Sequence, residues 1–278
     1  MIVVFTDLDG TLLDAETYSA DAAQAALKRL KELSIPLILC TSKTRAEAEI
    51  WRKELEIRDP FIVENGGALF IPNRYFPHPV ASPTHRNAYT VIELGTSYQE
   101  LVRTLRLCAS QAGCRVRGFY NMSAGEVAEC CGMSLEQAVL ARQREYDEPF
   151  EILDGDPENL LRAIAAAGKQ WTRGGRFYHI TGNNDKAHAV RLVAHHFRRQ
   201  YGAVVTFGIG DSLNDAGFLN AVQVPILIPS LHIDSLKQAV PNGRVAGQPG
   251  PAGWNSAVLG LLEEYSMHLP KLRNLPAG

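Results

Sequence analysis

The sequence begins with MIVVFTDLDGTLLD (residues 1–14), in which a short apolar run leads directly into closely spaced aspartates. Residues 2–6 are apolar and β-branched, as in a strand covered on both faces of a parallel sheet. Asp7 and Asp9 lie two positions apart, so their side chains leave an extended chain on the same side. Two carboxylates held this close repel each other and need a cation nearby. The stretch therefore predicts a buried strand with an acidic, cation-binding end.

Strands and helices alternate in the first and last parts of the chain. The predicted elements are strands at 35–40, 203–210 and 224–228, a strand–turn–strand unit at 61–72, and helices over 21–34, from Thr41–Thr44 onward and over 185–202. This alternation is typical of an α/β fold with a doubly wound, mainly parallel sheet.

The middle of the chain has a different pattern. Residues 73–87 are rich in proline and polar residues and predict a linker, which is followed by the pattern of a separate α+β unit. We therefore expect a core domain made of residues 1–82 and 184–278, with an α+β cap domain at 83–183 inserted into it. Glycine and proline at 247–253 predict a loop, and the sequence leaves open whether that loop closes over a ligand.

The composition is that of an ordinary globular protein with 278 residues and a formal net charge of −2. The chain has no excess of positive charge to bind a phosphodiester backbone, which argues against nucleic acid or an anionic membrane surface as a partner. No apolar stretch approaches the roughly 18 residues of a membrane span, so a cytoplasmic location is expected. The five cysteines show no Cys-x-x-Cys spacing and are interpreted as reduced, structural residues. A small anionic ligand fits these properties, and the oligomeric state is left open.

Polar residues follow several predicted strands, at the positions where ligands of open α/β sheets bind. They are Asp7 with Asp9, Thr41 with Ser42 and Lys43, Asp211 with Asp215, and Lys186 at a helix start. Each group alone could be an ordinary turn or helix cap, but together they predict one site. Carboxylates suit Mg²⁺, while a lysine and a hydroxyl near a helix N-terminus suit a phosphate.

A phosphate bound in this way would lie beside a nucleophile. The Asp7 carboxylate could attack phosphorus in line and give an aspartyl-phosphate, which divides one difficult displacement into two. Asp9 could protonate the departing alcohol and later deprotonate the hydrolytic water. Mg²⁺ and Lys186 would neutralise the phosphate oxygens. These residues therefore predict a magnesium-dependent phosphoryl-transfer site.

Four motifs occur in a characteristic order: DLDGTLLD (7–14), the Thr41 region, Asp185-Lys186 and GDSLND (210–215). In order and spacing they resemble the motifs of the haloacid dehalogenase-like phosphatases that carry a large cap after the second motif. A narrower resemblance, to the mannosyl-3-phosphoglycerate phosphatase family, rests on LCTSKTRAE (39–47), FIVENGGALFIP (61–72), REYDE (144–148), GGRFYH (174–179) and PGPAGW (249–254). It implies hydrolysis of a phosphorylated sugar-glycerate, mannosyl-3-phosphoglycerate, to phosphate and mannosylglycerate, a compatible solute.

The resemblance also implies roles for individual residues. Asp7 would be the nucleophile, Asp9 the acid and base, and Lys186 and Thr41 the phosphate-binding catalytic residues. The magnesium site would be formed by Asp7, the Asp9 carbonyl and Asp211, with Asp215 and Asn214 in support.

Substrate binding is predicted to involve residues of both domains: Ser42, Lys43, Asn65, Gly66, Arg144, Arg176, His179 and Asn214. The resemblance implies that Lys43 touches the phosphate or the glycerate carboxylate, and an arginine suits a carboxylate through a bidentate contact. Arg144, Arg176 and His179 could instead be solvated or form structural ion pairs. The turn at Asn65 and Gly66 could instead only close a hairpin.

Three other functions fit parts of the pattern. The enzyme could act on glucosyl-3-phosphoglycerate or another phosphosugar, because relatives with those substrates share much of the narrower motif set. It could be a phosphosugar mutase, since phosphomannomutases resemble the same core and cap; a mutase must exclude water from its phosphoenzyme. It could also be a non-catalytic sugar-phosphate sensor on a retained fold.

Overall fold

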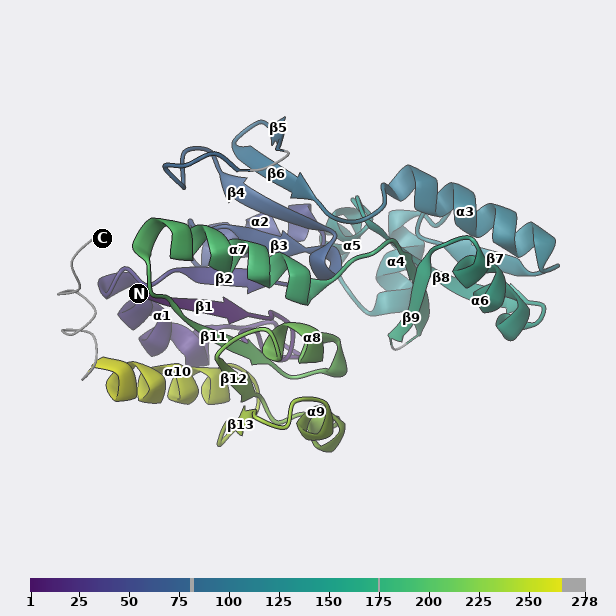
Figure 1. Cartoon of the computed structure of the whole chain (residues 1–278). Helices are drawn as coiled ribbons and strands as arrows, with labels where there is room; N and C mark the ends of the chain where they lie inside the picture. The colour runs from purple at the N-terminus through teal and green to yellow at the C-terminus, as the bar shows by residue number, and fades with distance from the viewer. Residues whose placement is uncertain (81–82, 175, 267–278) are drawn as a thin grey trace.

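The computed structural model describes residues 1–80, 83–174 and 176–266, which fold around a larger and a smaller sheet (Figure 1). The larger sheet has nine strands in the order β13-β12-β11-β1-β2-β3-β4-β6-β5. In chain order these strands are β1 (Ile2–Thr6), β2 (Leu37–Cys40), β3 (Phe61–Val63), β4 (Ala68–Pro72), β5 (Thr84–Arg86), β6 (Tyr89–Glu93), β11 (Val205–Gly210), β12 (Val224–Leu227) and β13 (Arg244–Val245). The strands from β13 to β3 run parallel, and β4, β6 and β5 add an antiparallel edge.

β1 lies in the middle of the parallel part, between β11 and β2. Its residues alternate between two apolar clusters: Ile2 and Val4 belong to one, and Val3 and Phe5 belong to the other. A strand that is apolar on both faces must be covered on both sides. The prediction of a doubly wound α/β core is confirmed.

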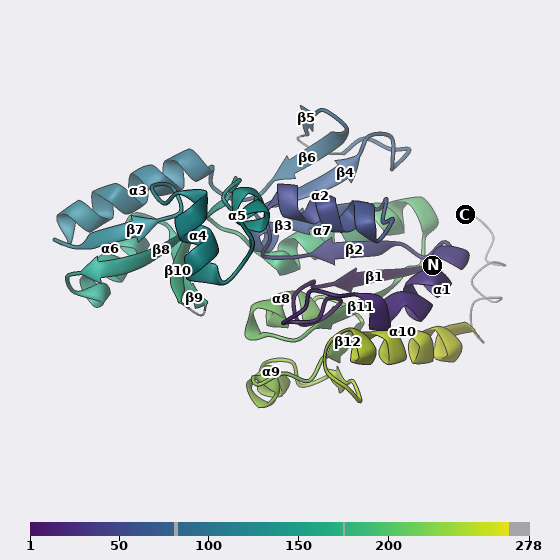
Figure 2. The ribbon, with the colours of Figure 1, turned by 180° about the vertical axis from the view of Figure 1, so that it is seen from behind.

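Helices cover both faces of this sheet (Figures 1 and 2). On the Ile2 side lie α1 (Gln24–Glu32), which follows a 3-10 turn at Asp21–Ala23, α2 (Arg45–Glu54) and α10 (Gly250–Ser266). On the Val3 side lie α7 (Lys186–Tyr201), α8 (Ala216–Leu219) and α9 (Ile233–Ala239). Among the described residues, no helix is both long and apolar enough to cross a bilayer.

The smaller sheet is antiparallel, in the order β7-β8-β10-β9, and forms the centre of the cap (Figure 1). Its strands are β7 (Arg115–Gly118), β8 (Asp147–Asp154), β9 (Gln170–Gly174) and β10 (Phe177–Thr181). α3 (Tyr98–Gln111) and α6 (Pro157–Ala166) pack around Phe150 and Ile180. α4 (Ala124–Cys131) and α5 (Leu135–Ala141) pack around Phe119 and Phe177. The inserted α+β unit is therefore present.

The chain enters the cap later than expected. β5 and β6 fall within the predicted cap segment, but β6 pairs with β4 at the edge of the core sheet and β5 pairs with β6. Val91 is fully buried in the larger apolar cluster of the core. Thr84–Arg86 contains no apolar residue, so periodicity gave no sign of β5. The strand pairing places residues 84–93 with the core, and the cap begins near α3.

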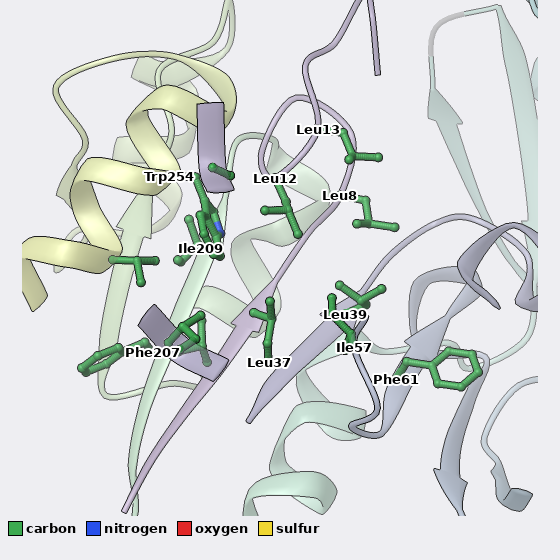
Figure 3. Packing of buried hydrophobic residues seen from close by; sticks show 14 of the residues in the cluster. Leu8, Leu12, Leu13, Leu37, Leu39, Ile57, Phe61, Phe207, Ile209 and Trp254 are labelled. Atoms are coloured by element: carbon green, nitrogen blue, oxygen red, sulfur yellow. The ribbon is translucent and has the colours of Figure 1, made fainter. Parts of the chain in front are cut away.

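The loop predicted at 247–253 is wrong from Gly250 onward, where α10 begins. Pro251 stands in the first turn, where a missing N–H interrupts no helical hydrogen bond. Gly253 packs so closely on the Gln248 carbonyl that a Cβ would collide with it. Trp254 follows and is fully buried beside Leu12 and Ile209 (Figure 3), where its Nε1–H donates to the Thr6 hydroxyl at 3.0 Å. Residues 250–254 therefore anchor α10 to β1.

We expect Trp254→Ala to lower the free energy of unfolding by about 3–5 kcal/mol, because it leaves a cavity and removes the hydrogen bond from the indole to the Thr6 hydroxyl. Urea denaturation followed by far-UV circular dichroism measures the loss. Trp171→Ala is the control. Because Trp171 is 41% exposed, the free energy of unfolding of this variant should differ from that of the unmodified protein by at most about 0.5 kcal/mol. Equal midpoints for Trp254→Ala and the unmodified protein would contradict this account of the anchor.

Candidate active site

Polar residues that follow three adjacent parallel strands lie together at one edge of the core sheet. β1 is followed by Asp7, β2 by Thr41 and β11 by Asp211. The Asp7 N–H donates to the Ile209 carbonyl at 3.0 Å, so pairing with β11 continues one residue beyond β1 and fixes the position of Asp7. This edge, at the carboxyl ends of the strands, is where ligands of open α/β sheets bind.

Lys186 brings a positive charge to this edge from the first turn of α7, where Asp185 Oδ1 caps the helix by accepting the Ala187 N–H at 2.7 Å. Lys186 Nζ lies 3.1 Å from Asp7 Oδ1 and 2.7 Å from Asp215 Oδ1, with the lysine side chain only 3% exposed. Burial opposes the charge, but Asp215 and Asp7 raise the pKa of Lys186 and keep it protonated. Burial, followed by Asp215, raises the pKa of Asp7 well above its ordinary value, and Lys186 opposes that rise.

The loop after β11 is organised around Asp215. Its Oδ2 accepts the N–H groups of Asp211 and Ser212, both at 3.2 Å, and the Ser212 hydroxyl at 3.1 Å. Asp211 Oδ1 accepts the Thr11 hydroxyl at 3.0 Å, and burial together with Asp215 raises the pKa of Asp211 to about 6. Gly10 has a φ of +74°, and a Cβ there would lie 2.7 Å from Asp211 Oδ2. Glycine is therefore required where the first motif meets this loop.

Asp7, Asp211 and Asp215 form one acidic group among the described residues, with a carboxylate oxygen of each within 4.8 Å of the others. Hard oxygen donors at this spacing fit Mg²⁺. Like charges in a desolvated site raise the pKa of Asp7 and of Asp211, and a bound cation would remove that cause. Predicted metal ligands are thus brought together, whereas the Asp9 carboxylate is not part of this group.

Asp9 is paired with a different lysine. Lys43 Nζ lies 3.0 Å from Asp9 Oδ1, 3.8 Å from Glu47 Oε1 and 5.0 Å from the centre of the Tyr18 ring. Burial raises the pKa of Asp9, and the Lys43 charge opposes the rise. The Asp9 side chain is 38% exposed, against 10% for Asp7. Asp9 therefore combines contact with solvent and a raised pKa, as a general acid requires.

Thr41 and Ser42 lie at the end of β2 and are held from two directions. The buried Thr41 hydroxyl accepts the Lys43 N–H at 3.1 Å, and the Thr41 carbonyl accepts the Asn65 N–H at 3.0 Å. The Ser42 carbonyl accepts Arg144 Nη1 of the cap at 3.0 Å. The predicted phosphate-binding loop at 41–43 therefore contacts both the core and the cap.

The turn between β3 and β4 contacts several parts of the site as well as closing the hairpin. Asn65 Oδ1 accepts Asn214 Nδ2 at 2.9 Å, which joins two predicted substrate-binding residues. Gly66 is buried, with a φ of +90°, and a Cβ there would collide with the Asp185 carbonyl. Gly66 therefore lets the turn pack against the start of α7.

Two of the three cap residues predicted to bind substrate share one carboxylate. Arg144 Nη1 lies 3.3 Å and His179 Nδ1 lies 3.0 Å from Oδ2 of the buried Asp147. Burial opposes ionisation of Asp147, but His179 and Arg144 lower its pKa below the ordinary value. Arg176 lies apart from them: its side chain is 53% exposed, and its Nε lies 3.4 Å from Glu151 Oε2.

Sequence reasoning missed two acids that organise these contacts, Glu64 and Asp147. Both are fully buried and lie in motifs already noted, FIVENGGALFIP and REYDE. Glu64 directly follows the apolar strand β3, and this position was an available signal, whereas Asp147 begins β8 in an acidic stretch that gave none. The signal at Glu64 does not reveal whether the partners are ligands, side chains or backbone groups.

Comparisons with known proteins establish the family. Residues 4–77 match the family model of haloacid dehalogenase-like hydrolases. Over 270 residues the chain is 43% identical to a glucosyl-3-phosphoglycerate/mannosyl-3-phosphoglycerate phosphatase of Methanococcoides burtonii, covering 94% of this chain and 97% of that protein. The chain belongs to this phosphatase family. A family member of the same name from Persephonella marina is 40% identical over 268 residues, covering 95% of this chain and 98% of that protein.

Family membership makes the protein a phosphoric monoester hydrolase, as predicted, and sets aside the mutase and sensor alternatives. A solved haloalkanoate-superfamily phosphatase from Bacteroides thetaiotaomicron has the same fold, with a TM-score of 0.65 and 16% identity. That comparison covers 96% of this chain and 95% of the other, so it includes the cap as well as the core.

We expect Lys186→Met to lower the free energy of unfolding by about 3–5 kcal/mol near pH 8 in EDTA, because Asp7 and Asp215 then face each other without a cation. The loss should shrink as the pH falls. A carboxyl whose pKa is higher in the folded than in the unfolded state gains stability as it takes up its proton.

Urea titrations at about pH 8 and about pH 5 measure the two losses, and Lys237→Met, at a lysine with 54% side-chain exposure, is the matched control. An equal loss for Lys186→Met at both pH values would contradict the assignment of the repulsion to Asp7 and Asp215.

Proposed function

We propose that the protein is a magnesium-dependent phosphatase that hydrolyses mannosyl-3-phosphoglycerate to mannosylglycerate and phosphate, and that it also accepts the glucosyl compound. The observation that carries the proposal is Asp7 held by Lys186, with Asp211 beside it and the more exposed Asp9 two residues further on. The names of the two family members include both sugars, which supports this substrate class.

The reaction proceeds in two displacements at phosphorus. The substrate phosphate binds to the Lys186 ammonium and the Thr41 hydroxyl. The Asp7 carboxylate attacks phosphorus, the bond to the glycerate oxygen breaks, and that oxygen takes a proton from Asp9. Asp9, now ionised, accepts a proton from water as the water oxygen attacks the aspartyl-phosphate. The bond between phosphorus and Asp7 breaks, and phosphate leaves.

Asp7 and Asp211 would supply carboxylate oxygens for Mg²⁺, and by family resemblance the Asp9 carbonyl would supply another oxygen. Asp215 stands in support, because one of its oxygens accepts from Lys186 and the other from the amides of the loop at 211–212. An ion held there would supply positive charge to the phosphate oxygens, which would favour attack by the Asp7 carboxylate.

The remainder of the substrate is assigned to Lys43 and the cap. Lys43 lies beside Asp9 and offers a positive charge to the glycerate carboxylate. In this proposal His179, which contacts Asp147, binds the substrate from the cap sheet, and Arg176 is exposed enough to exchange Glu151 for a substrate carboxylate. Arg144 acts through its hydrogen bond to the Ser42 carbonyl.

The substrate class is tested by phosphate release from mannosyl-3-phosphoglycerate, glucosyl-3-phosphoglycerate, 3-phosphoglycerate and mannose 6-phosphate, with Mg²⁺ and then with EDTA. We expect the two sugar-glycerates to exceed the other two compounds in kcat/KM by at least about 100-fold, because only they contact both Lys43 and the cap. EDTA should abolish all release. Equal turnover of the four compounds would contradict the proposal that the cap recognises the sugar-glycerate.

The roles of the two aspartates are tested by their asparagine variants. We expect Asp7→Asn to lose at least about three orders of magnitude in kcat on every substrate, because the nucleophile is gone. Asp9→Asn should keep the first displacement on p-nitrophenyl phosphate, whose leaving group needs no acid, and lose it on the alkyl phosphate of the sugar-glycerate. Rapid-quench measurement of the burst of nitrophenol and of the release of mannosylglycerate gives the rate of the first displacement on each substrate. Equal slowing of the first step on both substrates would contradict Asp9 as the acid.

A further inference from the structure

The turn at 64–67, between β3 and β4, is the place where the phosphate-binding loop, the cap and the return of the chain from the cap meet. The Gly67 carbonyl accepts the N–H groups of Leu94 and Gly95, where the chain leaves the core for the cap. Gly66 packs on Asp185, where the chain has returned. The turn therefore touches both crossings between core and cap.

Glu64 makes the larger part of these connections. Its N–H donates to the Lys43 carbonyl at 3.1 Å. Its carbonyl accepts Asn184 Nδ2 at 2.8 Å, beside the return crossing. Its carboxylate accepts the Tyr146 N–H at 2.7 Å and the Glu145 N–H at 2.9 Å, both in the cap. One residue thus holds three segments that are far apart in the sequence.

The backbone conformation and the burial of Glu64 both cost free energy. The residue is fully buried and has a φ of +47°, a region that residues with a Cβ rarely adopt. Backbone strain of this kind costs of order 1–3 kcal/mol and persists where the surroundings fix it. Burial also raises the pKa of Glu64 to about 8, and the nearby Arg144 charge and the two amides oppose this rise only in part.

The segment that Glu64 holds also reaches the phosphate-binding loop directly. Arg144, next to Glu145, donates to the Ser42 carbonyl at 3.0 Å and lies 3.3 Å from Asp147, the partner of His179. The ion pairs of the Glu145 side chain with Arg45 and Arg86 lie nearer the surface, where such pairs contribute little. The buried Glu64 contact is therefore the better-placed link between the loop at 41–43 and the cap segment at 144–147.

We propose that Glu64 is a positioning residue for the phosphatase reaction: its carboxylate sets the cap segment at 144–147 in register with the phosphate-binding loop at 41–43. It touches no substrate and acts through Arg144 and the Ser42 carbonyl. Substrates that contact the cap therefore depend on Glu64, and a small aryl phosphate does not. The proposal rests on the proposed function in that a sugar-glycerate is the substrate that spans both domains.

Glu64→Gln tests the proposal, because the variant keeps the volume but turns an Nε2–H donor toward the amide of either Glu145 or Tyr146. We expect kcat/KM for mannosyl-3-phosphoglycerate to fall by at least about 10-fold, while kcat/KM for p-nitrophenyl phosphate stays within about 2-fold. The matched control is Asp59→Asn, which removes a partly buried core carboxylate that accepts the Leu37 N–H at 3.0 Å and lies away from the cap. It should leave the ratio of the two values unchanged.

Amide hydrogen exchange gives a second readout that needs no substrate. In Glu64→Gln we expect at least about 10-fold faster exchange at both Tyr146 and Lys43, and unchanged exchange in β1. The Tyr146 N–H loses its carboxylate acceptor, and the loosened segment at 144–147 weakens the Arg144 hydrogen bond that holds the Ser42 carbonyl next to Lys43. Thermal denaturation confirms that each variant is folded at the assay temperature.

The outcomes separate the two proposals. A selective loss on the sugar-glycerate together with faster exchange at Tyr146 and Lys43 supports the positioning role. Equal losses on both substrates, no loss on either, or exchange that changes at Tyr146 alone would overturn it. If the unmodified protein cleaves p-nitrophenyl phosphate but no sugar-glycerate, the proposed substrate is wrong. The role of Glu64 is then decided by hydrogen exchange: faster exchange at Lys43 in Glu64→Gln supports it, and unchanged exchange at Lys43 overturns it.

Discussion

The buried ammonium of Lys186, shared by Asp7 and Asp215, is the interaction on which the rest of the site depends. It joins the end of β1 to the start of α7, which lies 179 residues later in the sequence, and to the loop after β11. Without the lysine, two desolvated carboxylates would face each other at the edge of the sheet, and a charged Asp7 would be hard to maintain. With it, Asp7 is buried and fixed in direction before a substrate arrives, and the Lys186 charge opposes the rise in the pKa of Asp7 that burial and Asp215 cause. The remaining parts of the site serve this arrangement: Gly10 permits the close approach of Asp211, and the amides at 211–212 orient Asp215.

The same interaction explains why the central part of the fold and of the site could be predicted from the sequence. Parallel strands place the residues that follow them at one edge, so Asp7, Thr41 and Asp211 could be brought together from strand order alone. Lys186 could be added because a helix that leads into a parallel strand begins at that edge. These inferences need only local pattern and the geometry of a sheet.

Other features depend on contacts that have no local pattern. β5 is a polar edge strand that is defined by its partner β6, and its sequence alone does not predict it. The start of α10 is rich in glycine and proline, and it is helical because Trp254 packs beneath β1 and Gly253 fits against Gln248. Glu64 and Asp147 are acids whose partners are backbone amides or cap side chains far away in the sequence. Arg144, which is predicted to bind substrate, contacts the Ser42 carbonyl and Asp147, and neither of these partners could be predicted from the sequence.

The position of β1 has a consequence for how the protein is made. β1 is synthesised before the strands on either side of it, yet one of these, β11, follows about 200 residues later, and the tryptophan that covers the end of β1 stands at position 254. An apolar strand in this position stays without this partner until β11 has been synthesised, whereas the strands of the cap, between 115 and 181, pair with one another as soon as they appear. The cap is therefore able to fold on the ribosome before the domain that carries the catalytic residues. The apolar strands of the incomplete core domain are therefore the part of the nascent chain that most needs protection by chaperones.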